Sequence, residues 1–267
     1  RGIMRIVDLR SDTVTMPTSK MRQVMKDAEV GDDGFGEDPT TNRLEEMAAE
    51  RLGREDALFV PSGIMGNLIA IMVHTKPGDG LICDRKAHIN TMVAGNTSAL
   101  TGTTICPLDA DETGHLNLEE LESLINLDDV RFPRTSLIVL ENTNNLAGGT
   151  VVTPEETAKI YKIAKRYGLR LHLDGARIFN SAIFQGVDVA ELAGDCDSVM
   201  FCLSKGLASP VGSIIAGTKE FIKEARRRRK MLGGSMRQTG ILASCGIVSL
   251  EEMTDRLAED HDNARYL

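Results

Sequence analysis

Two apolar runs of this chain each end in a residue that can take part in catalysis. Residues 171–174 read Leu-His-Leu-Asp and precede a glycine, and residues 199–203 are apolar and precede Ser-Lys-Gly. Each run is typical of a buried strand that breaks into polar residues and glycine. A lysine amine can form a Schiff base with pyridoxal phosphate (PLP), and a carboxylate can hold the proton on its ring nitrogen. Lys205 and Asp174 therefore predict a PLP-dependent enzyme.

A PLP enzyme also needs a cradle for the phosphate. Residues 61–67, Pro-Ser-Gly-Ile-Met-Gly-Asn, lead from a predicted strand through small residues into a predicted helix. Free N–H groups at a helix start attract a phosphate, so Ser62, Gly63 and Ile64 are cofactor-binding candidates. Many strand–helix junctions share this pattern, so the motif supports the prediction only together with the lysine and the aspartate.

Side chains near these runs are candidates for contacts with the ring and the substrate. Arg177 can hold the ring oxygen or a substrate carboxylate, with a surface ion pair as the alternative. His88 can stack on the ring, although an isolated histidine is more often a structural hydrogen-bonding residue. Asp174 can also cap the helix that follows it. His172 shares a strand face with Asp174, and we expect it to support or pack beside that residue.

Helix and strand patterns alternate along the chain, which predicts an α/β fold with a mostly parallel central sheet and helices on both faces. Such sheets bind ligands at the carboxyl ends of their strands, where Asp174 and Lys205 are expected. The predicted strands cover residues 57–61, 81–84, 103–107, 137–141, 169–174, 199–203 and 213–216. The predicted helices cover residues 17–28, 40–52, 63–73, 153–168, 219–231 and 240–265.

Composition narrows the class of protein. The 267 residues are 42% hydrophobic and carry a formal net charge of -8, which argues against nucleic acid or an anionic membrane surface as a partner. No apolar run approaches the length of a membrane span. The five cysteines form no CxxC pair and are expected as reduced, buried thiols, so we expect a cytoplasmic protein.

Two charged clusters are expected to have ordinary roles. The basic run 226–230 is predicted to form a solvated helix face beside Glu220 and Glu224. The acidic cluster at 32–38 is predicted to supply loop carboxylates and helix caps rather than metal ligands, so no metal site is expected.

With these residues in view, the chain resembles the low-specificity L-threonine aldolase family, which has the aspartate-aminotransferase-like PLP fold (fold type I). The resemblance runs from residue 8 to about residue 263, and its segments are specific in combination. They are residues 8–15, 30–33, 36–40, 141–143, 174–180, 203–207, 210–213 and 236–238.

The resemblance implies retro-aldol cleavage of L-threonine or L-allo-threonine to glycine and acetaldehyde. It implies Lys205 as the covalent anchor of PLP, Asp174 as the partner of the ring nitrogen and His88 as the stacking residue. For the catalytic base we expect His88, with an activated water as the alternative. It also implies that Arg177 binds the ring oxygen and, with Ser11, the substrate carboxylate. The family forms dimers of dimers, so we expect a homotetramer in which Arg237 reaches the phosphate of an adjacent subunit.

The chain departs from the family pattern on the substrate side of the site. Ile64 stands where the family has Thr, and Asn144 stands where it has His. Asn144 cannot act as a general base and is retained as a substrate-binding candidate. The segment 90–96 also lacks the family's aromatic residues and Glu. Two alternatives therefore stay open, namely a lyase or transaminase acting on another amino acid, and a catalytically weakened PLP-binding relative.

The domain prediction divides the chain into three parts. Residues 1–15 are expected to form an N-terminal arm, residues 16–245 the large PLP-binding domain, and residues 246–267 the start of a truncated C-terminal domain. The last division rests on a long helical pattern that no strand follows. Because the chain begins with Arg1 rather than Met, we expect its start to be a trimmed end or a tag remnant.

Overall fold

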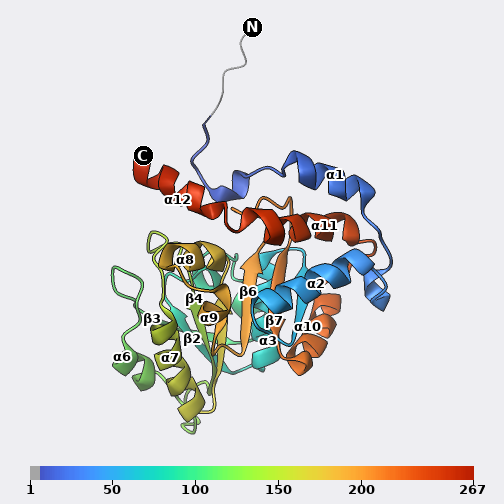
Figure 1. Cartoon of the computed structure of the whole chain (residues 1–267). Helices are drawn as coiled ribbons and strands as arrows, with labels where there is room; N and C mark the ends of the chain where they lie inside the picture. Colours follow the sequence, from blue (N-terminus) through green and yellow to red (C-terminus); the bar gives the residue numbers. More distant parts are fainter. Residues whose placement is uncertain (1–6) are drawn as a thin grey trace.

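A seven-stranded sheet lies at the centre of the computed structural model, which describes residues 7–267 (Figure 1). The strand order is β1-β7-β6-β5-β4-β2-β3, and β7 pairs antiparallel with both of its neighbours while every other pair is parallel. The predicted mostly parallel α/β sheet is therefore confirmed. The strands are β1 Asp56–Val60, β2 Gly80–Asp84, β3 Thr104–Leu108, β4 Thr135–Glu141, β5 Arg170–Asp174, β6 Ser198–Cys202 and β7 Ser213–Gly217.

Helices cover both faces of the sheet. Apolar residues of α2, α7, α8, α9 and α11 pack on one face, and those of α3 and α10 pack on the other. Because side chains alternate along a strand, Leu171 and Leu173 face the first layer while His172 and Asp174 face α3. The α-helices are α1 Ser19–Asp27, α2 Pro39–Arg51, α3 Gly63–His74, α4 His88–Thr91, α5 Asn96–Thr101, α6 Leu118–Ser123, α7 Pro154–Arg166, α8 Ile178–Gln185, α9 Val189–Ala193, α10 Lys219–Met231, α11 Gly240–Val248 and α12 Leu257–Tyr266.

The prediction of a single helix over residues 240–265 is wrong. The segment is divided into α11, a π-helical turn at Ser249–Met253 and α12. Tertiary hydrogen bonds hold the interruption, because Ser249 Oγ donates to the Leu207 carbonyl at 2.7 Å and Arg51 Nη2 donates to the Leu250 carbonyl at 3.0 Å. Arg51 thus bonds to a backbone carbonyl of the segment, and side chains that enter the hydrogen-bond ladder of a helix are a known cause of kinks.

The structure shows where the predicted N-terminal arm and the predicted C-terminal domain boundary fall in the fold. Residues 1–6 of the expected arm lie outside the described residues, and residues 7–15 include the short 3-10 helix η1 at Asp12–Val14. The predicted boundary at 245/246 falls inside α11, and the domain division stays a prediction. Among residues 7–267, none of the helices has the length and apolar character that a membrane crossing requires.

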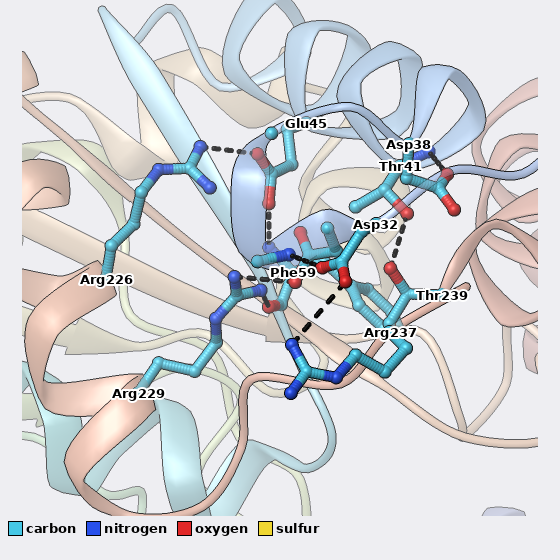
Figure 2. A network of polar contacts seen from close by, with 12 residues as sticks. Asp32, Asp38, Thr41, Glu45, Phe59, Arg226, Arg229, Arg237 and Thr239 are labelled. Carbon is cyan, nitrogen blue, oxygen red and sulfur yellow. Dashed lines mark hydrogen bonds and ion pairs between the residues drawn. The ribbon is translucent and has the colours of Figure 1, made fainter.

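The prediction that the basic run 226–230 forms a solvated face is wrong for two of its residues. Arg229 is only 3% exposed, with Nη2 2.7 Å from Asp33 Oδ2 and Nη1 donating to the Phe59 carbonyl at 2.8 Å. Arg226 donates to the buried carboxylate of Glu45 at 2.5 Å, as Figure 2 shows. These bonds join α10 to α2 and β1, and β1 leads directly into the predicted phosphate cradle.

Replacing Arg229 by methionine is expected to destabilise the protein by about 3–5 kcal/mol, because it leaves the Asp33 carboxylate buried without its cation. Urea unfolding followed by circular dichroism measures the change. Arg227→Met is the matched control, since its side chain is 70% exposed and pairs, among residues 7–267, only with Glu224. It should change stability by less than about 0.5 kcal/mol. Equal losses in the two variants would contradict the assigned role of Arg229.

Candidate active site

The carboxyl ends of β1, β2, β4, β5 and β6 lie along one edge of the sheet and surround a pocket of about 180 Å³. Both residues from which the sequence argument began, Lys205 and Asp174, line this pocket. The other lining residues are Ser62, Gly63, Ile64, Asn67, His88, Glu141, Asn145, Ala176, Arg177, Met200, Cys202 and Ser204.

Asp174 ends β5 and is only 2% exposed. Its Oδ1 accepts a hydrogen bond from the Ala176 N–H at 3.1 Å, and its Oδ2 accepts one from Asn67 Nδ2 at 2.6 Å. The bond to Ala176 forms a tight turn before α8, whose first residue is Ile178, so Asp174 does not cap that helix. Burial raises the pKa of Asp174, while the charges of Lys205 and His88 and these two donors oppose the rise.

Lys205 lies in a turn that follows β6. The Leu203 N–H bonds to the Gly212 carbonyl and the Ala208 N–H bonds to the Lys205 carbonyl, so the turn is fixed by its own backbone. Within residues 7–267, no hydrogen bond or ion pair engages the Lys205 amine. The amine is thus available to a ligand, and it is close enough to Asp174 to lower the pKa of that carboxyl.

The predicted phosphate cradle lies at the start of α3. Ser62 caps the helix by accepting a hydrogen bond from the Met65 N–H at 3.2 Å. No described residue accepts a hydrogen bond from the N–H groups of Gly63 or Ile64, which leaves two donors at the positive end of the helix. A Cβ at Gly63 would lie 2.7 Å from Cys202 Sγ, so only glycine lets α3 approach β6 this closely.

His88 begins α4 beside the pocket, and Glu141 holds its backbone. The His88 N–H donates to Glu141 Oε2 at 2.7 Å, and the Asn145 N–H donates to Glu141 Oε1 at 2.9 Å. Burial, reinforced by the charges of Lys205 and Arg177, lowers the pKa of His88 against the opposing charge of Asp174. A neutral imidazole at this position can accept a proton.

Glu141 is paired in register with Asp174 across β4 and β5, which places two buried carboxyl groups side by side. Burial and then the charge of Asp174 raise the pKa of Glu141 to about 7. The folded protein therefore binds this proton more tightly than the unfolded chain, for which the reference pKa is 4.5. The stabilisation is complete below that reference value and is lost as the pH rises to about 7.

We expect Glu141→Gln to remove this pH dependence. Between pH 4.5 and about 7, the unfolding free energy of the wild-type apoprotein should fall relative to that of the variant, by on the order of 2 kcal/mol. Denaturant titrations at several pH values measure the difference, with Glu112→Gln on an exposed loop as the matched control. Parallel pH profiles for wild type and Glu141→Gln would contradict the shifted pKa.

Arg177 lines the pocket and is held by the N-terminal segment. Its Nε and Nη2 donate to the two carboxylate oxygens of Asp12 at 2.7 and 2.8 Å. Burial lowers the pKa of Arg177, and the Asp12 carboxylate more than offsets this and raises it. Ser11 caps η1 by accepting a hydrogen bond from the Thr13 N–H, and it does not line the pocket.

Like Ser11, two other predicted site residues do not line the pocket of their own chain. Asn144 is buried, and its Nδ2 donates to Asp84 Oδ2 at 2.8 Å beside a separate cavity, whereas its neighbour Asn145 lines the pocket. Arg237 lies on another surface, where its Nη1 is 3.5 Å from Asp32 Oδ2 (Figure 2). The roles predicted for Asn144 and Arg237 therefore gain no support from the pocket of a single chain.

The pocket residues that were not predicted as site residues include Asn67, Glu141 and Asn145. Asn67 follows Gly63 by four residues, so it lies one helical turn beyond the cradle on the same face of α3. Glu141 ends an apolar strand just as Asp174 does. Helical spacing and strand-end position are the two signals that point to these residues.

The pocket has the groups that PLP requires. The N–H groups of Gly63 and Ile64, which have no partner among the described residues, suit a phosphate. Asp174 offers a buried carboxylate to a ring nitrogen, and Lys205 offers an unengaged amine to an aldehyde. The donor set and its arrangement around one cavity thus fit the cofactor.

Comparisons with known proteins place this site in a family. The model of the Beta-eliminating lyase family matches residues 8–267. The chain is 47% identical to low-specificity L-threonine aldolase 1 of Arabidopsis thaliana, covering 99% of this chain and 75% of that protein. It is 44% identical to the low specificity L-threonine aldolase of Escherichia coli (strain K12), covering 98% of this chain and 78% of that protein.

A solved structure agrees on the fold. The threonine aldolase of Leishmania major superposes with a TM-score of 0.85 at 23% identity, over 96% of this chain and 76% of that one. The family model and the sequence comparisons confirm the predicted family, and the chain spans about three quarters of the length of these relatives. The chain belongs to the beta-eliminating lyase family and, within it, to the low-specificity L-threonine aldolases.

Proposed function

We propose that this chain catalyses PLP-dependent retro-aldol cleavage of L-threonine or L-allo-threonine to glycine and acetaldehyde. The observation that carries the proposal is the meeting of Lys205, Asp174 and His88 around one pocket, beside the free N–H groups at the start of α3. Membership of the low-specificity L-threonine aldolase family supports the choice of substrate.

Several pocket residues would bind the cofactor, each through a different group. Bound PLP supplies an electron sink for negative charge at the Cα of an amino acid. Lys205 would anchor the cofactor, and Asp174 would hold the proton on its ring nitrogen. The N–H groups of Gly63 and Ile64 would bind the phosphate with Ser62 beside them.

The remaining pocket residues act on the substrate. Arg177 would bind its carboxylate through the N–H groups of Nη1 and Nη2 that are not bonded to Asp12, since a guanidinium has five N–H donors in all. A ring nitrogen of neutral His88 would accept the proton of the β-hydroxyl group as the Cα–Cβ bond breaks and acetaldehyde leaves. A proton returned to Cα then gives glycine.

A coupled assay tests this proposal. The purified protein is loaded with PLP and supplied with L-threonine, L-allo-threonine and a panel of other amino acids, and acetaldehyde and glycine are measured. Release of both products in equal amounts is the expected result. A PLP-loaded sample that yields no acetaldehyde from either threonine isomer would refute the proposed reaction, and turnover of another amino acid would identify the alternative.

We also propose that the protein works as a homotetramer with sites shared between subunits. Arg237 is 62% exposed in its side chain and does not reach the pocket of its own chain, which suits a role at a neighbouring site. Light scattering gives the assembly state, and Arg237→Ala should weaken PLP binding if the arginine serves a partner. The five free thiols support the cytoplasm as the proposed compartment.

A further inference from the structure

A continuous row of hydrogen bonds runs through the interior to Asp174. His74 Nε2 lies 2.7 Å from Ser198 Oγ, which lies 2.8 Å from His172 Nδ1. His172 Nε2 lies 3.0 Å from Asn67 Oδ1, and Asn67 Nδ2 donates to Asp174 Oδ2 at 2.6 Å. Ser198, His172 and Asn67 are at most 3% exposed. We call His74, Ser198, His172 and Asn67 the polar row.

The fold builds this row from three elements. Asn67 and His74 lie seven residues apart on α3, which is about two turns, so both face the sheet. His172 and Asp174 alternate on β5 and face the same side. Ser198 begins β6 and is the register partner of His172. The row therefore follows α3 across the sheet, from the start of β6 to the carboxyl end of β5.

The chemistry of Asp174 fixes the direction of every proton in the row. An ionised carboxylate only accepts, so Asn67 must donate through Nδ2 and offer Oδ1 to His172. That oxygen only accepts, so His172 must carry its proton on Nε2. Nδ1 of a neutral His172 then accepts from the Ser198 hydroxyl, which in turn accepts from the Nε2–H of His74.

The protonation of the two histidines agrees with this direction. Burial, the largest cause in both cases, lowers the pKa of His172 to about 3 and the pKa of His74 to about 3. Both imidazoles are therefore neutral near pH 7, as the row requires. All four hydrogen bonds then point their positive ends toward Asp174, and aligned hydrogen bonds of this kind polarise one another.

We propose that the polar row is a positioning device that favours the ionised form of Asp174 and fixes its orientation beneath the pocket. Burial alone disfavours that charge, and no cation forms an ion pair with Asp174 among residues 7–267. Donors directed at the carboxylate offset part of the cost. The inference rests on the proposed function only through the assigned role of Asp174 toward a ring nitrogen.

The first test needs neither cofactor nor turnover. Solid-state 15N NMR of the histidine-labelled apoprotein reports the tautomer of each of the five histidines. His74→Phe assigns one end of the row, because phenylalanine can keep the stacking on Phe221 at 4.9 Å and removes the N–H donor. We expect neutral His172 with its proton on Nε2. An Nδ1–H tautomer or an imidazolium at His172 would overturn the proposal.

The second test uses the PLP-loaded enzyme with L-threonine. We expect kcat to fall about 30-fold in Asn67→Leu, about 10-fold in Ser198→Ala and about 3-fold in His74→Phe, with KM changed less than about twofold. The order follows the distance along the row from Asp174, which a purely structural role would not produce. Ser136→Ala is the matched control, since this buried hydroxyl on β4 has no hydrogen-bond partner among the described residues.

The outcomes separate the two proposals. Losses of kcat that follow the melting temperature instead of the order in the row would overturn the positioning role. If Asn67→Leu does not fold, Ser198→Ala and His74→Phe still test the order. Should the wild type cleave no amino acid, the proposed function fails, while the tautomer of His172 in the apoprotein still decides whether the row has the inferred direction.

Discussion

Replacing Lys205 by alanine is expected to lower kcat for L-threonine cleavage by about 10⁴-fold or more. Lys205 is the lysine that lines the pocket, and no described partner engages its amine. No other lining residue has an amine that could anchor the cofactor. The variant should also show no covalent incorporation of PLP after borohydride reduction, as measured by mass spectrometry of the intact protein.

Two further variants separate the amine from the charge. Lys205→Arg keeps a cation near Asp174 and should still lose covalent incorporation, because a guanidinium stays protonated. Lys223→Ala removes an exposed lysine from α10 and should behave as wild type. Covalent PLP at unchanged stoichiometry in Lys205→Ala would show that another residue holds the cofactor.

Asp174→Asn is expected to lower kcat by on the order of 10³-fold while the protein stays folded. The amide keeps the size of the side chain but cannot carry the negative charge that holds a proton on a ring nitrogen. Burial raises the pKa of Asp174, so the folded apoprotein binds its proton more tightly than the unfolded chain. The protonated carboxyl therefore stabilises the fold at low pH, and this stabilisation is lost as the pH rises. The unfolding free energy of Asp174→Asn should not show this fall with pH.

Activity and stability should therefore separate in this variant. At neutral pH the melting temperature of Asp174→Asn should lie within a few degrees of the wild type, because relief from burying a charge offsets one weakened hydrogen bond. Asp84→Asn is the matched control, a buried carboxyl at the end of β2 that does not line the pocket. A loss of activity in Asp174→Asn no larger than in this control would refute the assigned role.

The strand ends were the most predictable part of the site. The seven predicted strands agree with the structure to within two residues at each end, and Asp174, His88 and Lys205 line one pocket. Local pattern suffices here because apolar runs mark buried strands, and parallel strands bring their carboxyl ends to one edge. The cradle at Ser62 and Gly63 was found in the same way, from a strand that passes through small residues into a helix.

Side-chain partners distant in sequence were less predictable. The pattern of residues 226–230 gave no sign that Arg229 pairs with Asp33, because that contact depends on how α10 packs against the loop before α2. The bidentate bond between Arg177 and Asp12 joins segments 165 residues apart. The interruption between α11 and α12 likewise depends on contacts between distant segments. Ser249 bonds to the Leu207 carbonyl, and Arg51 of α2 bonds to the Leu250 carbonyl in the π-helical turn.

The residue pattern alone predicted the seven strands, the long helices between them, the edge where the ligand site forms, and the lysine and aspartate at that edge. These features depend on short-range periodicity and on the geometry of parallel sheets. Which neighbours set the charge of those groups depends on how distant elements pack in the fold. Glu141 lies beside Asp174, and the polar row ends on Asp174. Both contacts are made between different elements, so they could not be predicted from local pattern.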